Sequence, residues 1–407
     1  MKKFDIPDQY KSSIIAKIKD LRKHEDPRKK DFGPTVLDFG NVEFFVARHF
    51  GFCFGVENAI EIAYKALNEN PGKRIFLLSE MIHNPHVNAD LNSRGINFIM
   101  DNYGKQFVNW DELKQEDIVI IPAFGTTVEI ENILKQKDVD IVKYNTTCPF
   151  VERVWNRAEA LSKEDYTIII HGQHKHEETK ATFSRSVIKS PSLIVRDIKE
   201  AEFLVSTMLN EKTQEDFLNF FAGKYTKGFD PAIDLVKIGV VNQTTMLASE
   251  TEKIAELLRK TMIQKYGVDR IDSHFADTRD TLCYATNDNQ LATLSLAETR
   301  ADLAFVIGGY NSSNTSHLVE ILEEKIPTYF ISDPDKIISD KSINHFNLTT
   351  KKEVVTDNYL PKKEKVKIAV TSGASCPDSI VDEVLKKIVA LINPNSAIEI
   401  TPTINIY

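Results

Sequence analysis

Cysteine is scarce in this chain, and its spacing excludes the common cysteine-rich motifs. Among 407 residues there are four cysteines: Cys53, Cys148, Cys283 and Cys376. No two of them form a C-x-x-C pair, so zinc ribbons, thioredoxin-type sites and the compact clusters of ferredoxins do not fit. If several of these thiols bind one metal centre, the fold must bring them together from distant parts of the chain.

Long apolar runs and a basic excess are also absent. The sequence contains no stretch of about 18 apolar residues, so we expect no transmembrane helix and no membrane partner. The first residues lack the apolar segment of a secretory signal, so we expect a cytoplasmic protein whose thiols stay reduced. The 51 basic and 59 acidic residues give a net charge of −8, which argues against a nucleic-acid partner. A local pocket can still bind a small anion.

What the sequence does contain is a repeated alternation of apolar runs, polar loops and helical periods. Five apolar runs are each followed by a polar loop and an amphipathic segment; they cover residues 42–50, 139–145, 236–242, 302–309 and 366–371. Such alternation predicts an α/β fold with mostly parallel sheets, whose ligands gather at the carboxyl ends of the strands. Three of the five loops contain a cysteine.

Two segments do not follow this rhythm, and we assign no function to either. Residues 9–24 have apolar side chains at helical spacing, which predicts a peripheral helix or an oligomer contact. Residues 205–233 read as an insertion with one short helix near residues 215–221.

Two of the cysteines precede a proline. Pro149 follows Cys148 and Pro377 follows Cys376, and proline suits the first position of a helix. A thiol at that place faces the partial positive charge of the helix N-terminus. This position favours the thiolate, which is the form that binds iron.

Three loops are rich in hydroxyl and amide side chains, namely Gln243–Thr245, Asn311–Asn314 and Ser372–Ser375. Helix capping explains one such residue per helix. Clusters with glycine also suit anion-binding loops built from backbone N–H groups, and they could hold a diphosphate without Lys or Arg. No G-x-x-x-x-G-K-[ST] motif is present, so the chain has no P-loop.

Histidine gathers in two segments, residues 83–86 and 171–179. Each histidine alone is as well explained by a solvated or core position. The second segment is not an H-E-x-x-H motif. A His beside a Glu at an anion pocket fits diphosphate binding together with proton donation.

The series GFCFGV, HNPHV, TTCP, HEET, QTT, CYAT, SSN and GAS, in this order, resembles the LytB/IspH family of 4-hydroxy-3-methylbut-2-enyl diphosphate reductases, from about residue 44 to 395. The resemblance implies three small α/β domains with mostly parallel sheets, in a pseudo-threefold arrangement around a central iron–sulfur cluster. The implied ranges are an N-terminal extension at 1–43 and domains at 44–148, 149–279 (with the insertion 205–233) and 280–407.

The resemblance also implies the activity. It is the reductive dehydroxylation of an allylic diphosphate to isopentenyl and dimethylallyl diphosphate, the last step of the non-mevalonate isoprenoid pathway. Cys53, Cys148 and Cys283 carry over as the ligands of a 4Fe-4S cluster with one open iron. A ferredoxin- or flavodoxin-type protein is the implied electron donor.

The remaining site residues carry over in the same way. Glu178 corresponds to the proton donor of the family, and Thr244 to the residue that holds the substrate hydroxyl. The implied diphosphate contacts are His83, His176, Ser312, Ser313, Asn314 and Ser375.

Two positions depart from the pattern. Phe124 stands where the well-known bacterial form has a histidine, and this A-F-G version resembles the plant and cyanobacterial branch. His174 and Thr126 are the candidates to replace the missing donor. Cys376 stands where the family usually has alanine, and it is either an inert core thiol or an accidental fourth iron ligand. Two alternatives remain for the whole chain: a non-redox diphosphate-binding protein, and a structural zinc protein.

Overall fold

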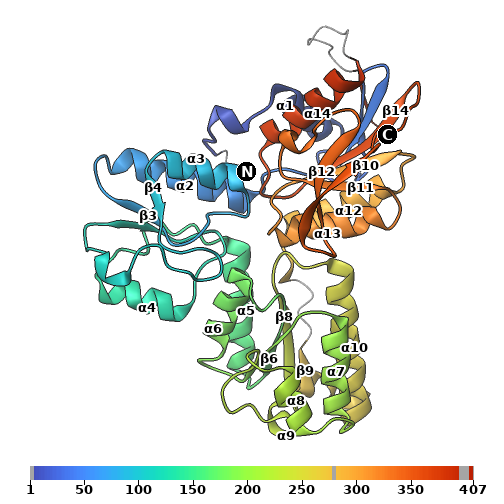
Figure 1. Ribbon diagram of the computed structural model, residues 1–407. Helices are drawn as coiled ribbons and strands as arrows, with labels where there is room; N and C mark the ends of the chain where they lie inside the picture. Colours follow the sequence, from blue (N-terminus) through green and yellow to red (C-terminus); the bar gives the residue numbers. More distant parts are fainter. Residues whose placement is uncertain (1–3, 277–280, 394–402, 407) are drawn as a thin grey trace. The chain divides into compact units, whose positions relative to one another are not determined.

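Strands that run parallel form three separate sheets in the computed structural model, which describes residues 4–276, 281–393 and 403–406 (Figure 1). The chain divides into two compact units. Unit 1 comprises residues 1–57, 83–86 and 284–407, and unit 2 comprises residues 58–82 and 87–283.

Unit 1 contains a six-stranded sheet in the order β11-β10-β14-β2-β1-β15. Its first four strands are parallel; β1 pairs antiparallel with β2, and β15 pairs antiparallel with β1. Ile307 at the end of β10 pairs with Ser372 at the end of β14, so the loops that follow these two strands leave the sheet side by side. The strands are β1 (Thr35–Asp38), β2 (Val42–Val46), β10 (Leu303–Ile307), β11 (Thr328–Ile331), β14 (Val366–Ser372) and β15 (Thr403–Ile406).

Helices and a hairpin complete unit 1. The helices α12 and α13 pack on each other and on β14, while α1 packs on α14. The helix α1 begins where the Ser12 hydroxyl accepts the Ile15 N–H, and it confirms the helix expected in residues 9–24. These elements are α1 (Ser13–Glu25), α12 (Tyr284–Ala297), α13 (Ser313–Glu323), α14 (Asp378–Ile392) and the hairpin strands β12 (Ser342–Asn347) and β13 (Lys352–Asp357). The helix α2 (Phe54–Glu69) starts in unit 1 and continues in unit 2.

Unit 2 holds two sheets, and the smaller has three parallel strands in the order β4-β3-β5. Figure 1 shows α2 and α3 on one side of it and α4 on the other. Because both faces are covered, these short strands are almost wholly apolar. The elements are β3 (Ile75–Leu77), α3 (Pro85–Ser93), β4 (Ile96–Phe98), β5 (Ile118–Ile120) and α4 (Val128–Gln136).

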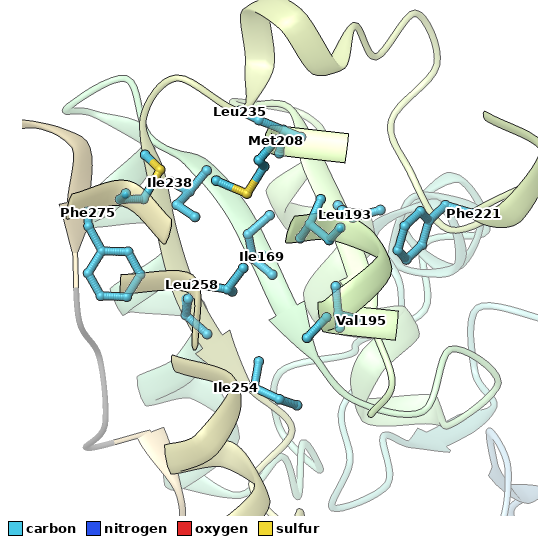
Figure 2. Packing of buried hydrophobic residues seen from close by; sticks show 14 of the residues in the cluster. Ile169, Leu193, Val195, Met208, Phe221, Leu235, Ile238, Ile254, Leu258 and Phe275 are labelled. Carbon is cyan, nitrogen blue, oxygen red and sulfur yellow. The ribbon is translucent and has the colours of Figure 1, made fainter. Parts of the chain in front are cut away.

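The larger sheet of unit 2 has the order β7-β6-β8-β9, all parallel. On one face, Ile169, Leu193 and Ile238 pack against Leu258 of α10 and Met208 of α7 (Figure 2). On the other face, α5 and α6 cover the sheet. The elements are α5 (Pro149–Ser162), β6 (Thr167–His171), α6 (Glu177–Ser186), β7 (Ser192–Val195), α7 (Ile198–Met208), α8 (Gln214–Phe220), α9 (Pro231–Asp234), β8 (Ile238–Asn242), α10 (Ala248–Tyr266), α11 (Ile271–His274) and β9 (Phe275–Ala276).

One expected strand is wrong. Residues 139–145 form turns, and only Asn145 makes an isolated bridge, to Ile121. The Asp140 carboxylate accepts the N–H groups of Val142 and Lys143, which satisfies the backbone locally instead of in a sheet. The last strand before the Cys148 loop is β5 of the three-stranded sheet, and α4 lies between them in the sequence.

The insertion and the two prolines that follow cysteines agree with the predictions in part. The insertion 205–233 contains the expected short helix, α8, and a second one, α9. Pro149 occupies the first position of α5 as expected, whereas Pro377 lies one residue earlier, at the N-cap of α14. Among the helices that the structure describes, none has the length and apolarity needed to cross a membrane.

Candidate active site

A buried acid–hydroxyl contact of unit 2 joins two neighbouring strand ends. Glu178 lies in the first turn of α6, after β6, and is 1% exposed. Its carboxylate accepts the Thr244 N–H at 2.6 Å and the Thr244 hydroxyl at 3.0 Å. Thr244 follows β8, and β6 pairs directly with β8. The structure therefore brings together the two residues that were expected to deliver the proton and to hold the substrate hydroxyl.

A second layer of polar contacts fixes these two loops. The Gln243 side-chain oxygen accepts the Thr179 hydroxyl at 3.0 Å and the Gln173 N–H at 3.1 Å. Gly172 sits so close that an added Cβ would lie 2.6 Å from the Thr179 hydroxyl oxygen. Only glycine fits there. The contact between Thr179 and Gln243 was not predicted, although both residues lie within motifs that the sequence singles out.

His176 is oriented by the helix that it precedes. Its Nδ1 accepts the Glu178 N–H at 3.2 Å, which caps α6. A ring nitrogen that accepts carries no proton, so the neutral ring holds its proton on Nε2 and can donate it to an anion. The Phe124 ring packs edge-on against His176, with ring centroids 5.5 Å apart. Phe124, which stands at the position of the histidine in the bacterial form, therefore contacts one of the two histidines expected to bind the diphosphate.

Other histidines of the same segment behave differently. His171 is fully buried, and its Nδ1 shares a hydrogen bond with the Thr251 hydroxyl of α10, so it is a core histidine. His174 is half-buried; burial and neighbouring lysines such as Lys224 lower its pKa. The Thr126 carbonyl accepts a hydrogen bond from Arg185. Replacement of the missing donor by His174 or Thr126 stays a prediction.

The thiols of Cys148 and Cys283 lie close enough in unit 2 to interact electrostatically, and Cys148 also interacts with Glu178. Cys148 is the N-cap of α5, and Asn145 shapes its loop by accepting the Thr147 N–H and hydroxyl. An N-x-T sequence before the cysteine is the signal for this turn. The Cys283 N–H donates to the Thr244 carbonyl at 3.3 Å. Thus the Cys283 backbone is tied directly to the loop that contains Thr244.

The helix N-terminus acts on Cys148 in the expected direction, but in the protein alone another effect is larger. Burial raises the pKa of Cys148 to about 11, although the N–H groups of Phe150 and Val151 at the start of α5 act in the opposite direction. Desolvation therefore exceeds the effect of the helix N-terminus. A bound metal removes the proton from a coordinating thiol outright, so this burial does not disfavour a metal ligand.

In unit 1 the site loops follow β2, β10 and β14. The Cys53 N–H donates to the Ala374 carbonyl at 3.1 Å, which joins the first loop to the third. The Ser375 hydroxyl donates to the His83 carbonyl at 3.1 Å. Because that proton is already in use, Ser375 would have to turn to bind a diphosphate. The convergence of Cys53 with Cys148 and Cys283 stays a prediction.

Hydroxyl and amide groups at the start of α13 divide into two kinds. Ser312 caps the helix: its oxygen accepts the Thr315 N–H at 3.2 Å and the Thr315 hydroxyl at 2.9 Å. Its own O–H remains available to donate. The Ser313 hydroxyl and both polar atoms of the Asn314 amide are buried and have no hydrogen-bond partner among the described residues. Such groups are costly unless a ligand pairs with them.

These features define an α/β protein whose strand-end loops hold thiols, a buried acid and neutral hydrogen-bonding side chains. Residues 44–389 match the family of the LytB protein. The chain belongs to this family. The resemblance stated from the motifs is therefore confirmed.

Named relatives and a solved structure agree with this membership. The 4-hydroxy-3-methylbut-2-enyl diphosphate reductase of Cyanothece sp. is 41% identical over 392 residues, which cover 96% of this chain and 91% of the relative. The reductase of that name from Synechocystis sp. is 42% identical over 365 residues, 89% and 94% of the two chains. Both organisms belong to the branch that the A-F-G motif indicates.

The fold has a counterpart in the structure of the E-1-hydroxy-2-methyl-but-2-enyl-4-diphosphate reductase from Plasmodium falciparum. The TM-score is 0.61 at 23% identity, and the match covers 89% of this chain and 95% of that one. The predicted fold class is confirmed, whereas the domain limits 44–148, 149–279 and 280–407 stay predictions.

Family membership implies an iron–sulfur cofactor. The donor set fits it, because thiolates are the usual ligands of iron–sulfur clusters. All four cysteines lie in the described residues as thiols, and Cys148 approaches Cys283.

Proposed function

We propose that this chain is a 4-hydroxy-3-methylbut-2-enyl diphosphate reductase, the terminal enzyme of the non-mevalonate pathway. It removes the hydroxyl group of the allylic diphosphate by reduction and forms isopentenyl and dimethylallyl diphosphate. The observation that carries the proposal is the buried hydrogen-bonded pair of Glu178 and Thr244, with Glu178 in electrostatic interaction with the thiol of Cys148. An acid, a hydroxyl and a thiol ligand in one place are what a reductive removal of water requires.

The proposed cofactor is a 4Fe-4S cluster held by Cys53, Cys148 and Cys283. When bound, such a cluster supplies electrons one at a time and offers one iron as a Lewis acid. The polypeptide contributes three thiols, and each of these side chains is at least half-buried. In our proposal a ferredoxin- or flavodoxin-type protein delivers the electrons.

We assign diphosphate binding to two kinds of groups: buried polar atoms that lack a hydrogen-bond partner among the described residues, and side chains with a hydrogen to donate. Asn314 and Ser313 have buried polar atoms that lack partners among the described residues, and Ser312 keeps an O–H to donate. His176 offers Nε2–H because its Nδ1 is occupied. His83 and Ser375 complete the proposed set. Neutral donors of this kind bind an anion without the strong salt bridges that would slow product release.

Proton delivery is assigned to Glu178. The reaction consumes two electrons and two protons per substrate; the C–O bond breaks and the oxygen leaves as water. In its ionised form Glu178 accepts two hydrogen bonds from Thr244. When protonated, it keeps the bond from the Thr244 N–H and has an O–H to give to the leaving hydroxyl, which Thr244 holds beside it.

The test is purification without oxygen, followed by iron analysis, absorption spectroscopy and turnover with a chemically reduced one-electron dye. We expect a brown protein with about four irons per chain, the content of one cubane cluster. We also expect conversion of the hydroxylated diphosphate into both products. A colourless, folded protein that binds pyrophosphate would identify a non-redox diphosphate-binding protein. Zinc in place of iron would identify the structural zinc alternative. Either result contradicts the proposal.

A further inference from the structure

The segment His83–His86 belongs to unit 1, although the chain on both sides of it belongs to unit 2. Its backbone rests on the loops that follow β10 and β14. The His83 carbonyl accepts the Ser375 hydroxyl at 3.1 Å, and a Cβ added to Gly309 would lie 2.3 Å from the same oxygen. The segment is therefore held at the edge of the proposed diphosphate site.

His86 holds the other end of this segment. Its Nε2 lies 3.6 Å from an Asp333 carboxylate oxygen, an ion-pair distance that is too long for a hydrogen bond. The His86 ring as a whole is 41% exposed, yet Nε2 itself is inaccessible to solvent. The side chain of His86 therefore directs its buried nitrogen at Asp333.

The Asp333 carboxylate is held in place by hydrogen bonds that do not involve His86. It follows β11, and its oxygens accept the Ser332 hydroxyl at 2.6 Å and the Asp335 N–H at 2.8 Å. It thereby caps the short helix Pro334–Lys336. Interactions with His86 and Ser332 lower the pKa of Asp333, so this carboxylate stays charged at neutral pH.

The position of His86 would be unfavourable without Asp333. His86 lies in the first turn of α3, and a positive charge near a helix N-terminus is destabilising. Its N–H donates to the Asn84 side chain at 3.0 Å, and Pro85 restricts the backbone between them. A displacement of the His86 ring is therefore passed to Asn84 and His83 through a short, stiff piece of chain.

We propose that His86 and Asp333 form a latch that fixes the His83–His86 segment on unit 1 and so sets the place of His83 in the diphosphate site. The inference rests on the proposed function, because it assigns a role in diphosphate binding. His86 is a positioning residue in this scheme and does not contact the substrate.

The latch gives diphosphate affinity a dependence on pH. The groups that face His86 are Asp333 on its loop, Asp335 on the adjacent short helix and Glu383 on α14; Lys387 of α14 lies near Asp335. Asp333 raises the pKa of His86 above its usual value, mainly through their direct contact, while burial opposes this. The cation, and with it the latch, is present at low pH and is lost as pH rises through that raised pKa.

The experiment measures the dissociation constant of inorganic pyrophosphate, and the KM and kcat of the hydroxylated diphosphate, in the anaerobically purified holoenzyme. In His86→Gln and in Asp333→Asn we expect the dissociation constant and KM to rise roughly fivefold, as the loss of one partly exposed ion pair permits. We expect kcat to change less than twofold. The double variant should bind pyrophosphate no more weakly than either single variant, because the two substitutions break the same contact.

His24→Gln, on the exposed end of α1, is the matched control and should bind pyrophosphate like the wild type. The dissociation constant of pyrophosphate for His86→Gln, divided by that for the wild type, should fall towards one between pH 6 and pH 9. Taking this ratio removes the effect of the titration of pyrophosphate itself. His86→Lys keeps a cation and should restore affinity at the upper end of this range.

The outcomes separate the two proposals. If the wild type turns over substrate but His86→Gln binds pyrophosphate within twofold of it at every pH, the latch is wrong and the proposed function stands. If the variant only loses thermal stability, while its pyrophosphate affinity stays at the wild-type value, the latch is likewise wrong. If the wild type neither binds pyrophosphate nor turns over substrate, the proposed function is wrong, and the latch with it.

Discussion

Glu178 accepts both hydrogen bonds that Thr244 can offer, from its N–H at 2.6 Å and from its hydroxyl at 3.0 Å. The two residues lie 66 positions apart in the sequence and meet because β6 and β8 are parallel neighbours. The contact is buried, since Glu178 is 1% and Thr244 is 4% exposed. A buried carboxylate that two hydrogen bonds join to one threonine is held in one orientation, as a proton donor must be.

Replacement of Glu178 by glutamine keeps the shape of this contact and removes the transferable proton. We expect kcat to fall by about 100-fold to 1000-fold, within the usual range for loss of general acid catalysis, with KM changed little. Steady-state kinetics and iron content, measured on the same preparation, check this. Glu152→Gln, an exposed position in the first turn of α5, is the control and should keep its rate. Unchanged turnover in Glu178→Gln would exclude Glu178 as the proton source.

Asn314 allows a test that separates ligand binding from folding. Its amide is 3% exposed and has no partner among the described residues, so the polypeptide alone gains nothing from it. Asn314→Ala should therefore leave the melting temperature unchanged or raise it, because removal of an unsatisfied buried group is not costly. KM should rise about tenfold, which corresponds to one lost hydrogen bond to a charged ligand.

The neighbouring Thr315→Val is the contrast. Its hydroxyl bonds to Ser312, so its loss should lower the free energy of unfolding by about 1 kcal/mol. A clear loss of stability in Asn314→Ala, with KM unaltered, would mean that the amide serves the fold and not the diphosphate.

A substitution of Phe124 tests whether its ring positions His176. Its ring packs edge-on against His176 at 5.5 Å. Phe124→Leu removes this contact, and we expect KM to rise about threefold with kcat retained, since aromatic pairs contribute about 0.5–1.5 kcal/mol. Phe220→Leu is the matched control: Phe220 lies in the insertion, and its ring stacks on Phe203 of α7. Equal KM values for both variants would show that Phe124 does not position His176.

Much of the site could be predicted because the relevant signals are local. Glycine, serine and threonine clusters at the ends of apolar runs indicate strand-end loops, and α6, α10 and α13 begin where those loops end. The pairing of Glu178 with Thr244 could not be read in this way, because it depends on which strands are neighbours. Only the resemblance placed both residues in one site.

The failures have physical causes that a pattern of apolar residues does not contain. At residues 139–145 a single carboxylate, that of Asp140, satisfies two backbone N–H groups and ends the strand pattern. At Cys148 the helix N-terminus favours the thiolate, but burial has the larger effect on the pKa. The depth of burial and the competition between turn and strand are set by tertiary packing, which the local sequence does not specify.

The variant Cys376→Ala tests whether Cys376 is an inert core thiol or an accidental fourth iron ligand. It is fully buried, its thiol contacts the Pro377 carbonyl at 3.6 Å, and burial raises its pKa far above that of an exposed thiol. Cys53, Cys148 and Cys283 are only partly buried, whereas Cys376 has no exposed surface through which a metal centre could reach its sulfur. Cys376→Ala should keep about four irons per chain and a kcat within about twofold of the wild type, at a cost in stability of about 1 kcal/mol for the small cavity. Cys53→Ala, in the same unit, should by contrast lose iron and activity together. Loss of iron or of most turnover in Cys376→Ala would show that this fourth thiol belongs to the metal centre.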